Sequence, residues 1–187
     1  MTRIIAGRLG GRRLTVPEEG TRPTSDRVRE ALFSLLAARI DLDGAEVLDL
    51  YAGSGALGIE AHSRGAGAVT FVDARRRATS VIGANASALG IARSVQVVTA
   101  SVASYLAGAP RSFDLVLSDP PYDLDPGLVA ADLRRIADGW LAPGGLVVLE
   151  RARRTTVTWP DSMAVIVEKR YGDTVVEVGG LAQPPTA

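Results

Sequence analysis

The stretch that decides the fold is Asp49-Leu50-Tyr51-Ala52-Gly53-Ser54-Gly55-Ala56-Leu57-Gly58. The apolar residues 46–51 are expected to form a buried strand. The glycines that follow have the G-x-G-x-x-G spacing of a strand-to-helix turn that binds a nucleotide. The next strand, residues 68–73, ends in Asp73, at the position where an acid accepts hydrogen bonds from ribose hydroxyls. Strand, turn, helix and acid together predict a site for an adenosine group.

Two cofactors with an adenosine group compete for this turn, a dinucleotide and S-adenosylmethionine. A dinucleotide places its pyrophosphate at the helix N-terminus, and the charge of Asp49, four residues before Gly53, disfavours a second negative group there. The same carboxylate suits the cationic amino-acid end of S-adenosylmethionine, and D-x-x-x-G-x-G spacing is typical of methyltransferases. We therefore expect S-adenosylmethionine as the cofactor and S-adenosylhomocysteine as the product. The residues expected to bind it are Asp49, Ala52, Gly53, Ser54, Gly55, Asp73 and Ala74.

Asp119-Pro120-Pro121-Tyr122 is the second informative stretch. It follows residues 113–118, an expected buried strand, and ligands of open α/β sheets bind at such strand ends. Proline lacks a backbone N–H, so the segment offers carbonyl and carboxylate acceptors, and Tyr122 adds a flat ring that can stack. Acceptors beside an aromatic ring fit an exocyclic amino group on a nucleobase. We predict Asp119, Pro120 and Tyr122 as the catalytic residues, with Asp119 also facing the cofactor.

The chain from residue 45 onward alternates strands and helices. Parallel strands are expected over residues 46–51, 68–73, 95–100, 113–118 and 145–150. Gly65 and Gly90 are expected to end the intervening helices. Residues 163–170 and 174–178 flank Gly172-Asp173 and indicate an antiparallel hairpin at the sheet edge. This order predicts an α/β, Rossmann-like, doubly wound sheet of seven strands.

The N-terminal segment is basic and has the pattern of a small β-hairpin. Residues 4–6 and 12–16 are the expected strands, with a glycine-rich turn between them, and a helix carrying Val28, Leu32 and Leu36 follows. The first acid is Glu18, after arginines at positions 3, 8, 12 and 13. These side chains, Arg3, Arg8, Arg12 and Arg13, fit two roles, phosphate contact or a solvated edge strand that resists pairing.

Composition limits the function classes. The 187 residues carry no net charge, one histidine and no cysteine, which excludes a disulfide framework, a thiolate nucleophile and cysteine-bound zinc. We expect no metal. No apolar run reaches the roughly 20 residues of a membrane span, and residues 1–7 lack a signal-peptide core. We expect a cytoplasmic monomer that does not associate with membranes.

Four further polar side chains favour structural roles. His62 lies within the helix after the glycine-rich turn and is expected to pack or face solvent. Asn85 could reach the cofactor or the base, but a helix-surface amide is the favoured interpretation. Asp123 and Asp125 are expected to cap the next helix rather than to bind metal.

The ordered set of motifs resembles the RsmD family of class I methyltransferases. The matching segments are Arg3-Ile4-Ile5-Ala6-Gly7, Gly11-Arg12, Arg22-Pro23-Thr24, Arg29-Glu30-Ala31-Leu32-Phe33, Asp49 to Gly55, Gly58-Ile59-Glu60-Ala61, Ser63-Arg64-Gly65-Ala66, Asp119 to Tyr122 and Tyr171-Gly172-Asp173-Thr174. The resemblance spans nearly the whole chain and is weakest over residues 150–165. It implies methyl transfer to N2 of one guanine in bacterial small-subunit (16S) ribosomal RNA, with a 30S assembly particle as the expected partner.

The resemblance also carries residue roles. It implies RNA contact by a hairpin region 1–20, a methyltransferase domain over 21–187, and Arg22 and Thr24 near the cofactor or base. Relatives often have a polar or acidic residue after the third strand, where this chain has Ala100-Ser101-Val102; the Ser101 hydroxyl and the Val102 backbone are the candidates for adenine contact. Two alternatives stay open: an adenine-N6 or cytosine-N4 nucleic-acid methyltransferase, and a non-catalytic cofactor-binding module in RNA assembly.

Overall fold

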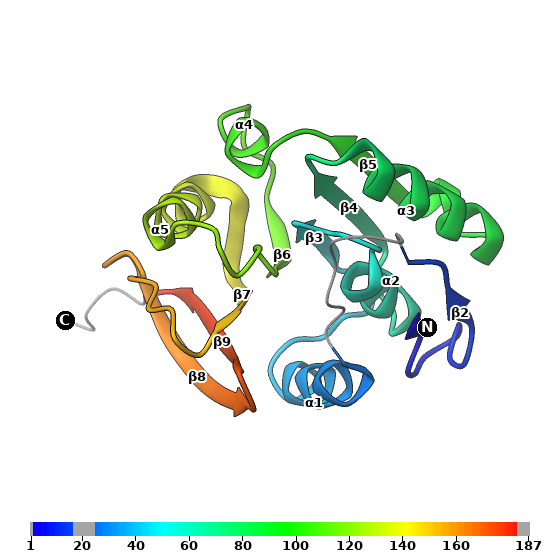
Figure 1. The fold of residues 1–187 in the computed structure, drawn as a ribbon, viewed down its shortest axis with the longest axis horizontal. Helices are drawn as coiled ribbons and strands as arrows, with labels where there is room; N and C mark the ends of the chain where they lie inside the picture. Colours follow the sequence, from blue (N-terminus) through cyan, green and yellow to red (C-terminus); the bar gives the residue numbers. More distant parts are fainter. Residues whose placement is uncertain (1, 17–24, 183–187) are drawn as a thin grey trace.

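The computed structural model describes residues 2–16 and 25–182 of the chain. Its centre is a seven-stranded sheet with the order β5-β4-β3-β6-β7-β9-β8 (Figure 1). The strands are β3 (Glu46–Leu50), β4 (Ala68–Asp73), β5 (Val95–Thr99), β6 (Phe113–Ser118), β7 (Leu141–Ala152), β8 (Met163–Tyr171) and β9 (Thr174–Leu181). The first five are parallel, and β9 pairs antiparallel with both β7 and β8. The predicted fold class and the C-terminal hairpin are confirmed.

Within the described residues, five α-helices cover the sheet. They are α1 (Asp26–Ala37), α2 (Ala56–Ser63), α3 (Arg76–Leu89), α4 (Val102–Leu106) and α5 (Pro126–Arg135). Ser25 caps α1 by accepting a hydrogen bond from the Val28 N–H, and Asp125 caps α5 through the Gly127 N–H at 2.6 Å, as predicted for Asp125. Gly90 ends α3 at φ 73°, a left-handed conformation that glycine adopts without strain.

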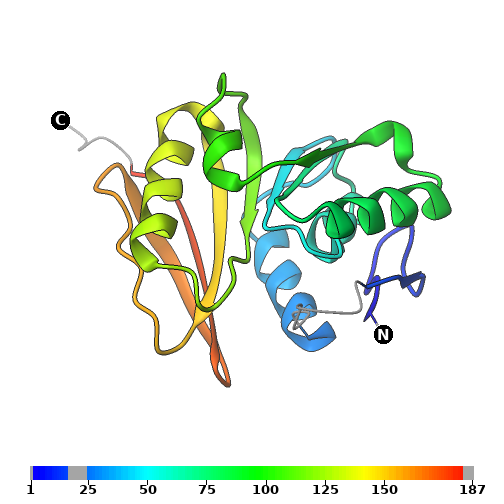
Figure 2. The same ribbon diagram turned by 45° about the horizontal axis from the view of Figure 1, so that its top comes forward.

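The core has two parts, one on each face of the sheet. Side chains of α1, α2 and α3, such as Phe33, Ile59 and Ile82, pack against one face. Side chains of α4 and α5, such as Val102 and Leu133, pack on the other face. Figure 2 shows these two helices beside β6 and β7. This double covering explains why the parallel strands are continuous apolar runs. No helix within the described ranges is long and apolar enough to cross a membrane.

The N-terminal hairpin is shorter than predicted. Its paired residues are β1 (Thr2–Arg3) and β2 (Arg13–Leu14), and residues 4–6, expected as a strand, form none. The reason is competition for backbone donors: the buried Glu60 carboxylate accepts the Ile5 N–H at 2.7 Å and the Ala6 N–H at 3.1 Å. A side chain of α2 therefore replaces strand pairing at this point.

The hairpin is packed onto the body of the protein. Ile4, Leu9 and Leu14 are buried in the same core as α1, α2 and α3. The Leu9 N–H also donates to the Ser63 hydroxyl at 3.0 Å. The division expected between residues 20 and 21 falls within 17–24, outside the described residues.

Candidate active site

The glycine-rich turn joins β3 to α2 and is held in left-handed backbone conformations. Gly53 has φ 57° and Gly55 has φ 77°, and Gly55 occupies the N-cap position of α2. Tyr51 also has a positive φ, 55°. This backbone conformation is energetically unfavourable for a residue that has a Cβ atom. Its hydroxyl donates to Asp132 of α5 at 2.6 Å, and this contact offsets the cost by fixing the turn to a helix. Sequence reasoning did not identify the pairing of Tyr51 with Asp132, because it joins elements far apart in the chain.

Asp49 is a buried carboxylate beside this turn. Its side chain is 1% exposed and accepts the Gly58 N–H at 2.9 Å. Burial, and in addition the negative charge of Asp73, raises the pKa of Asp49 to about 8, whereas the Gly58 hydrogen bond acts in the opposite direction. A cation next to Asp49 would reverse this shift. The Asp49 carboxylate is thus an acceptor that could pair with the ammonium end of an amino acid, the role predicted for it.

Asp73 lies at the end of β4, as predicted. Its carboxylate accepts the Gly53 N–H at 2.9 Å and the Arg75 backbone N–H at 2.9 Å. The Arg75 guanidinium adds contacts of 3.1 and 3.2 Å to the two carboxylate oxygens. Asp73 therefore holds the turn through a direct hydrogen bond and directly precedes the exposed Ala74. Arg75 was missed by sequence reasoning.

Ser101 and Val102 lie at the start of α4, beyond β5. The Ser101 hydroxyl accepts the Ser104 N–H at 3.1 Å and caps the helix. The Val102 N–H belongs to the first turn, where backbone donors have no acceptor within the helix. Of the two candidates for adenine contact, the Ser101 hydroxyl is thus engaged as a helix cap, and the Val102 N–H is a backbone donor of the first turn.

Asp119-Pro120-Pro121-Tyr122 follows β6, at the same sheet edge as the glycine-rich turn. Ser118 pairs with Leu50 of β3 and with Leu149 of β7, so the tetrapeptide leaves the sheet between these two strands. Asp119 is half-buried, Pro120 is buried and Pro121 is exposed. The predicted acceptors and the glycine-rich turn thus follow the ends of two adjacent strands, β6 and β3.

Tyr122 is half-buried, and its hydroxyl is engaged. The hydroxyl donates to Glu150 of β7 at 3.2 Å and lies 2.7 Å from the Thr174 hydroxyl of β9. Burial, followed by the charges of Glu150 and Asp119, raises the pKa of Tyr122. The sequence signal for Thr174 was its place in a matching motif, whereas Glu150 carried none.

The prediction that Asn85 lies on the helix surface was wrong. Of the two roles expected for His62, packing and solvent exposure, the structure shows packing. Asn85 is 4% exposed rather than on the helix surface, and its amide bonds to Thr15 of the hairpin and to the Ser54 carbonyl. His62 is buried and packs. Its Nδ1 donates to the Ala66 carbonyl at 2.6 Å, and its Nε2 accepts from Arg8. Buried polar groups of this kind follow from tertiary contacts that helix periodicity does not reveal.

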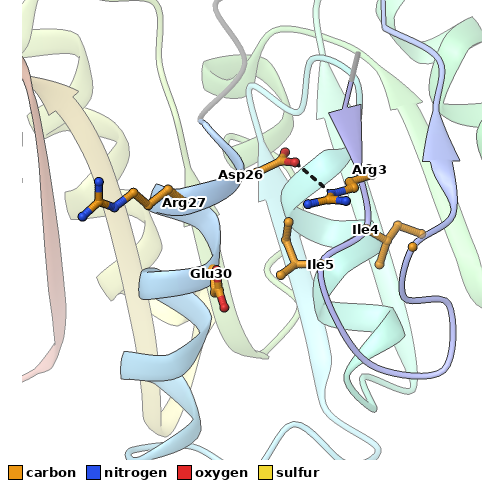
Figure 3. Close-up of a pocket in the computed structure, with 7 residues that line it drawn as sticks. Arg3, Ile4, Ile5, Asp26, Arg27 and Glu30 are labelled. Carbon is orange, nitrogen blue, oxygen red and sulfur yellow. Dashed lines mark ion pairs between the residues drawn. The ribbon is translucent and has the colours of Figure 1, made fainter.

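The hairpin arginines Arg3, Arg8, Arg12 and Arg13 are all exposed. Arg3 forms an ion pair with Asp26 of α1 at 3.3 Å, across a cavity of about 410 Å³ between hairpin and helix (Figure 3). Arg12 donates to the Ala88 carbonyl of α3 at 3.2 Å. Two further predicted contacts, Arg22 and Thr24, lie outside the described residues. In the ranges 2–16 and 25–182, no three acidic or histidine side chains are arranged to hold a metal ion.

Comparison with known proteins identifies the family. The family model described as Conserved hypothetical protein 95 matches residues 2–179. The chain belongs to the RsmD family. It is 41% identical over 150 residues to Ribosomal RNA small subunit methyltransferase D of Escherichia coli (strain K12), covering 79% of this chain and 73% of that protein.

Other relatives of this RsmD-family chain agree. The Haemophilus influenzae protein of the same name is 35% identical over 174 residues, covering 91% and 89% of the two chains. The solved structure of yhhF from Escherichia coli, described as a candidate methyltransferase, superposes with a TM-score of 0.84 at 37% identity. It covers 95% of this chain and 96% of that one. The resemblance in the sequence and the class I methyltransferase fold are thereby confirmed.

Proposed function

We propose that this RsmD-family protein transfers a methyl group from S-adenosylmethionine to the exocyclic N2 of a guanine in small-subunit ribosomal RNA. The observation that carries the proposal is the meeting of two sites at one sheet edge. The buried carboxylate of Asp49 lies below the glycine-rich turn, and Asp119 to Tyr122 leave the adjacent strand β6. The names of the curated relatives support small-subunit ribosomal RNA as the substrate.

The residues at the turn fit S-adenosylmethionine. Asp49 faces the cationic amino-acid end, Asp73 the ribose hydroxyls, and the Val102 N–H the adenine. Ala52, Gly53, Ser54, Gly55, Ala74 and Ser101 complete this predicted site. When bound, the cofactor supplies an electrophilic methyl group on a sulfonium sulfur. A carboxylate with its pKa raised by burial gains most from such a cationic ligand, because the ligand restores the charge that burial disfavours.

The acceptors of Asp119 and Pro120 make N2 reactive. The N2 lone pair of guanine is delocalised into the ring, so the amine must become pyramidal before it attacks. The Asp119 carboxylate and the Pro120 carbonyl accept the two N2 hydrogens and turn the developing lone pair toward the methyl group. Positioning and preorganised acceptors supply the acceleration. One N2 proton passes to the Asp119 carboxylate that accepts it, and because this follows the transfer, Asp119 need not be a strong base.

Tyr122 provides the stacking surface. A base must leave its own stack to reach an enclosed reactive centre, and an aromatic ring compensates for the lost stacking. Tyr122 adjoins Asp119 and Pro120, so the base that it stacks against presents its amine to these acceptors.

RNA capture belongs to the hairpin region in this proposal, with residues 21–187 as the catalytic domain. The exposed arginines on one ribbon match the spaced phosphates of RNA. The zero net charge favours a 30S assembly particle over free RNA as the substrate, with a monomeric enzyme acting on it.

Methyl transfer to ribosomal RNA tests the function. The substrates are free 16S RNA and 30S particles from a strain that lacks the protein, with labelled cofactor and nucleoside analysis of the product. We expect N2-methylguanosine, whereas N6-methyladenosine or N4-methylcytidine would overturn the choice of base. Asp119→Ala and Tyr122→Ala are expected to lose most of the turnover, and near-normal rates in both would refute the site.

A further inference from the structure

The hydroxyl of Tyr122 is bound from two neighbouring strands of the sheet. The Glu150 carboxylate on β7 lies 3.2 Å away, and the Thr174 hydroxyl on β9 lies 2.7 Å away. In the antiparallel β7–β9 ladder, Glu150 pairs with Val176 and Ala152 pairs with Thr174. Both contacts therefore come from one rigid part of the sheet, whereas Tyr122 is in a loop.

The directions of these hydrogen bonds follow from the chemistry of the three groups. The Glu150 carboxylate accepts the hydrogen bond from the single proton of the Tyr122 hydroxyl. The Tyr122 oxygen must then accept the proton of the Thr174 hydroxyl. The result is a directed chain from Thr174 to Tyr122 to Glu150. Glu150 is 5% exposed and Tyr122 is half-buried, so their contact is partly shielded from solvent.

The turn before Thr174 is built to place it. Gly172 has φ 61°, which favours glycine in the tight turn between β8 and β9. The Arg153 N–H donates to the Asp173 carbonyl at 2.7 Å and ties the turn to the end of β7. The segment Tyr171-Gly172-Asp173-Thr174 lies far in sequence from Asp119 to Tyr122, yet its last residue contacts the last residue of that tetrapeptide.

We propose that Thr174 is a positioning residue that acts through the Tyr122 hydroxyl and holds the ring at the angle at which it stacks on the guanine. This inference rests on the proposed role of Tyr122. The hydroxyl serves as an anchor and transfers no proton, and its pKa, raised by burial and by two carboxylates, agrees with a group that stays neutral. A side chain held by hydrogen bonds from supporting residues keeps the geometry that a binding site requires.

The test is a double-mutant cycle between Tyr122→Phe and Thr174→Val. Tyr122→Phe keeps the ring and removes the anchor, and Thr174→Val removes the donor with little change of shape. Each is expected to lower kcat about 10-fold, because a part-buried hydrogen bond is lost and the ring turns. The KM for S-adenosylmethionine is expected to stay within about 2-fold. The double variant is expected to be no slower than the slower single variant, because both changes break one chain.

Thr174→Ser is the rescue variant, since it restores the donor and is expected to regain at least half of the wild-type kcat. Thr156→Val, at an exposed position of the preceding loop, is the matched control and should leave kcat unchanged. Effects that multiply in the double variant, or a normal kcat in Thr174→Val, would overturn the proposal. If Thr174→Val does not fold, a normal kcat for Tyr122→Phe alone overturns it equally.

Tyr122→Ala separates this inference from the proposed function. Normal turnover in Tyr122→Ala would remove the stacking role on which this inference rests, and with a normal rate in Asp119→Ala it would also refute the proposed site. An inactive Tyr122→Ala together with a fully active Tyr122→Phe would leave the stacking role intact and refute only the anchor.

Discussion

The Asn85 side chain forms hydrogen bonds with both the N–H and the carbonyl of Thr15. Its amide oxygen accepts the Thr15 N–H at 3.0 Å, and its amide nitrogen donates to the Thr15 carbonyl at 2.9 Å. The same nitrogen donates to the Ser54 carbonyl at 3.3 Å, within the glycine-rich turn. One side chain of α3 therefore joins the hairpin to the glycine-rich turn. This contact couples the positions of the surface proposed for RNA and the site proposed for the cofactor.

Asn85→Ala is expected to loosen this junction. Three backbone groups, on Thr15 and Ser54, lose their partner, and each buried unsatisfied group costs on the order of 1–3 kcal/mol unless water replaces it. We expect a lower melting temperature and weaker binding of S-adenosylmethionine, measured by thermal unfolding and by calorimetric titration. Ser87→Ala, on the exposed face of the same helix, is the control. Unchanged cofactor affinity in Asn85→Ala would show that the turn holds its shape without the hairpin.

Asp49 is expected to release a proton when the cofactor binds. Its pKa in the cofactor-free protein is about 8, and the ligand ammonium lowers it by favouring the carboxylate. At about pH 6.5 the ligand amine is itself protonated, so the proton comes from the protein. Calorimetry in buffers of different ionisation enthalpy should give about one proton released for the wild type and close to none for Asp49→Asn. Equal release in both would place the titrating group elsewhere.

The raised pKa of Asp49 also determines whether the folding stability rises or falls with pH. The pKa of Asp49 rises on folding from 3.8, the ordinary value for an aspartate, to about 8. Between these values the folded state binds the proton that the unfolded state has lost, so the stability contributed by Asp49 falls as pH rises. Asp49→Asn should therefore flatten the decline in melting temperature toward pH 8. A parallel decline in both proteins would contradict the assignment.

The sequence predicted the fold because most of its signals were local. The apolar runs indicated all seven strands of the main sheet, and Asp73 ends its strand where the ribose-binding position was expected. The first hairpin strand was predicted at the wrong residues because Glu60 accepts the N–H groups of Ile5 and Ala6. Glu60 lies 54 residues from Ala6 in sequence, so no local signal indicates this contact. Asn85 was misplaced for the same physical reason. Its partners come from the hairpin and the turn, and helix periodicity carries no information about them.

The glycine at position 58 is required by packing rather than by backbone conformation. A Cβ at Gly58 would come within 2.4 Å of the Phe71 ring and 2.8 Å of Val69. Gly58→Ala is expected to lower stability by about 1–3 kcal/mol, because the core of α2 and β4 must move apart. Gly83→Ala on α3 is the matched control: nothing lies within 4 Å of its added Cβ, so helix propensity should raise the melting temperature. Thermal unfolding measures the melting temperatures of both variants. If both rise or both fall relative to the wild type, the packing explanation for Gly58 is refuted.

Arg13 provides a clean test of phosphate contact by the hairpin. Arg12 also bonds the Ala88 carbonyl, so its substitution would alter the attachment of the hairpin, whereas Arg13 is exposed on β2. If Arg13 meets a phosphate, Arg13→Ala should reduce the slope of log affinity against log salt by about 0.7–0.9. Arg134→Ala, exposed on α5 across the sheet, should leave the slope unchanged. Binding of labelled 16S RNA fragments or 30S particles over a salt series measures both variants. An unaltered slope in Arg13→Ala would favour the alternative role of this arginine, a solvated edge residue that resists strand pairing.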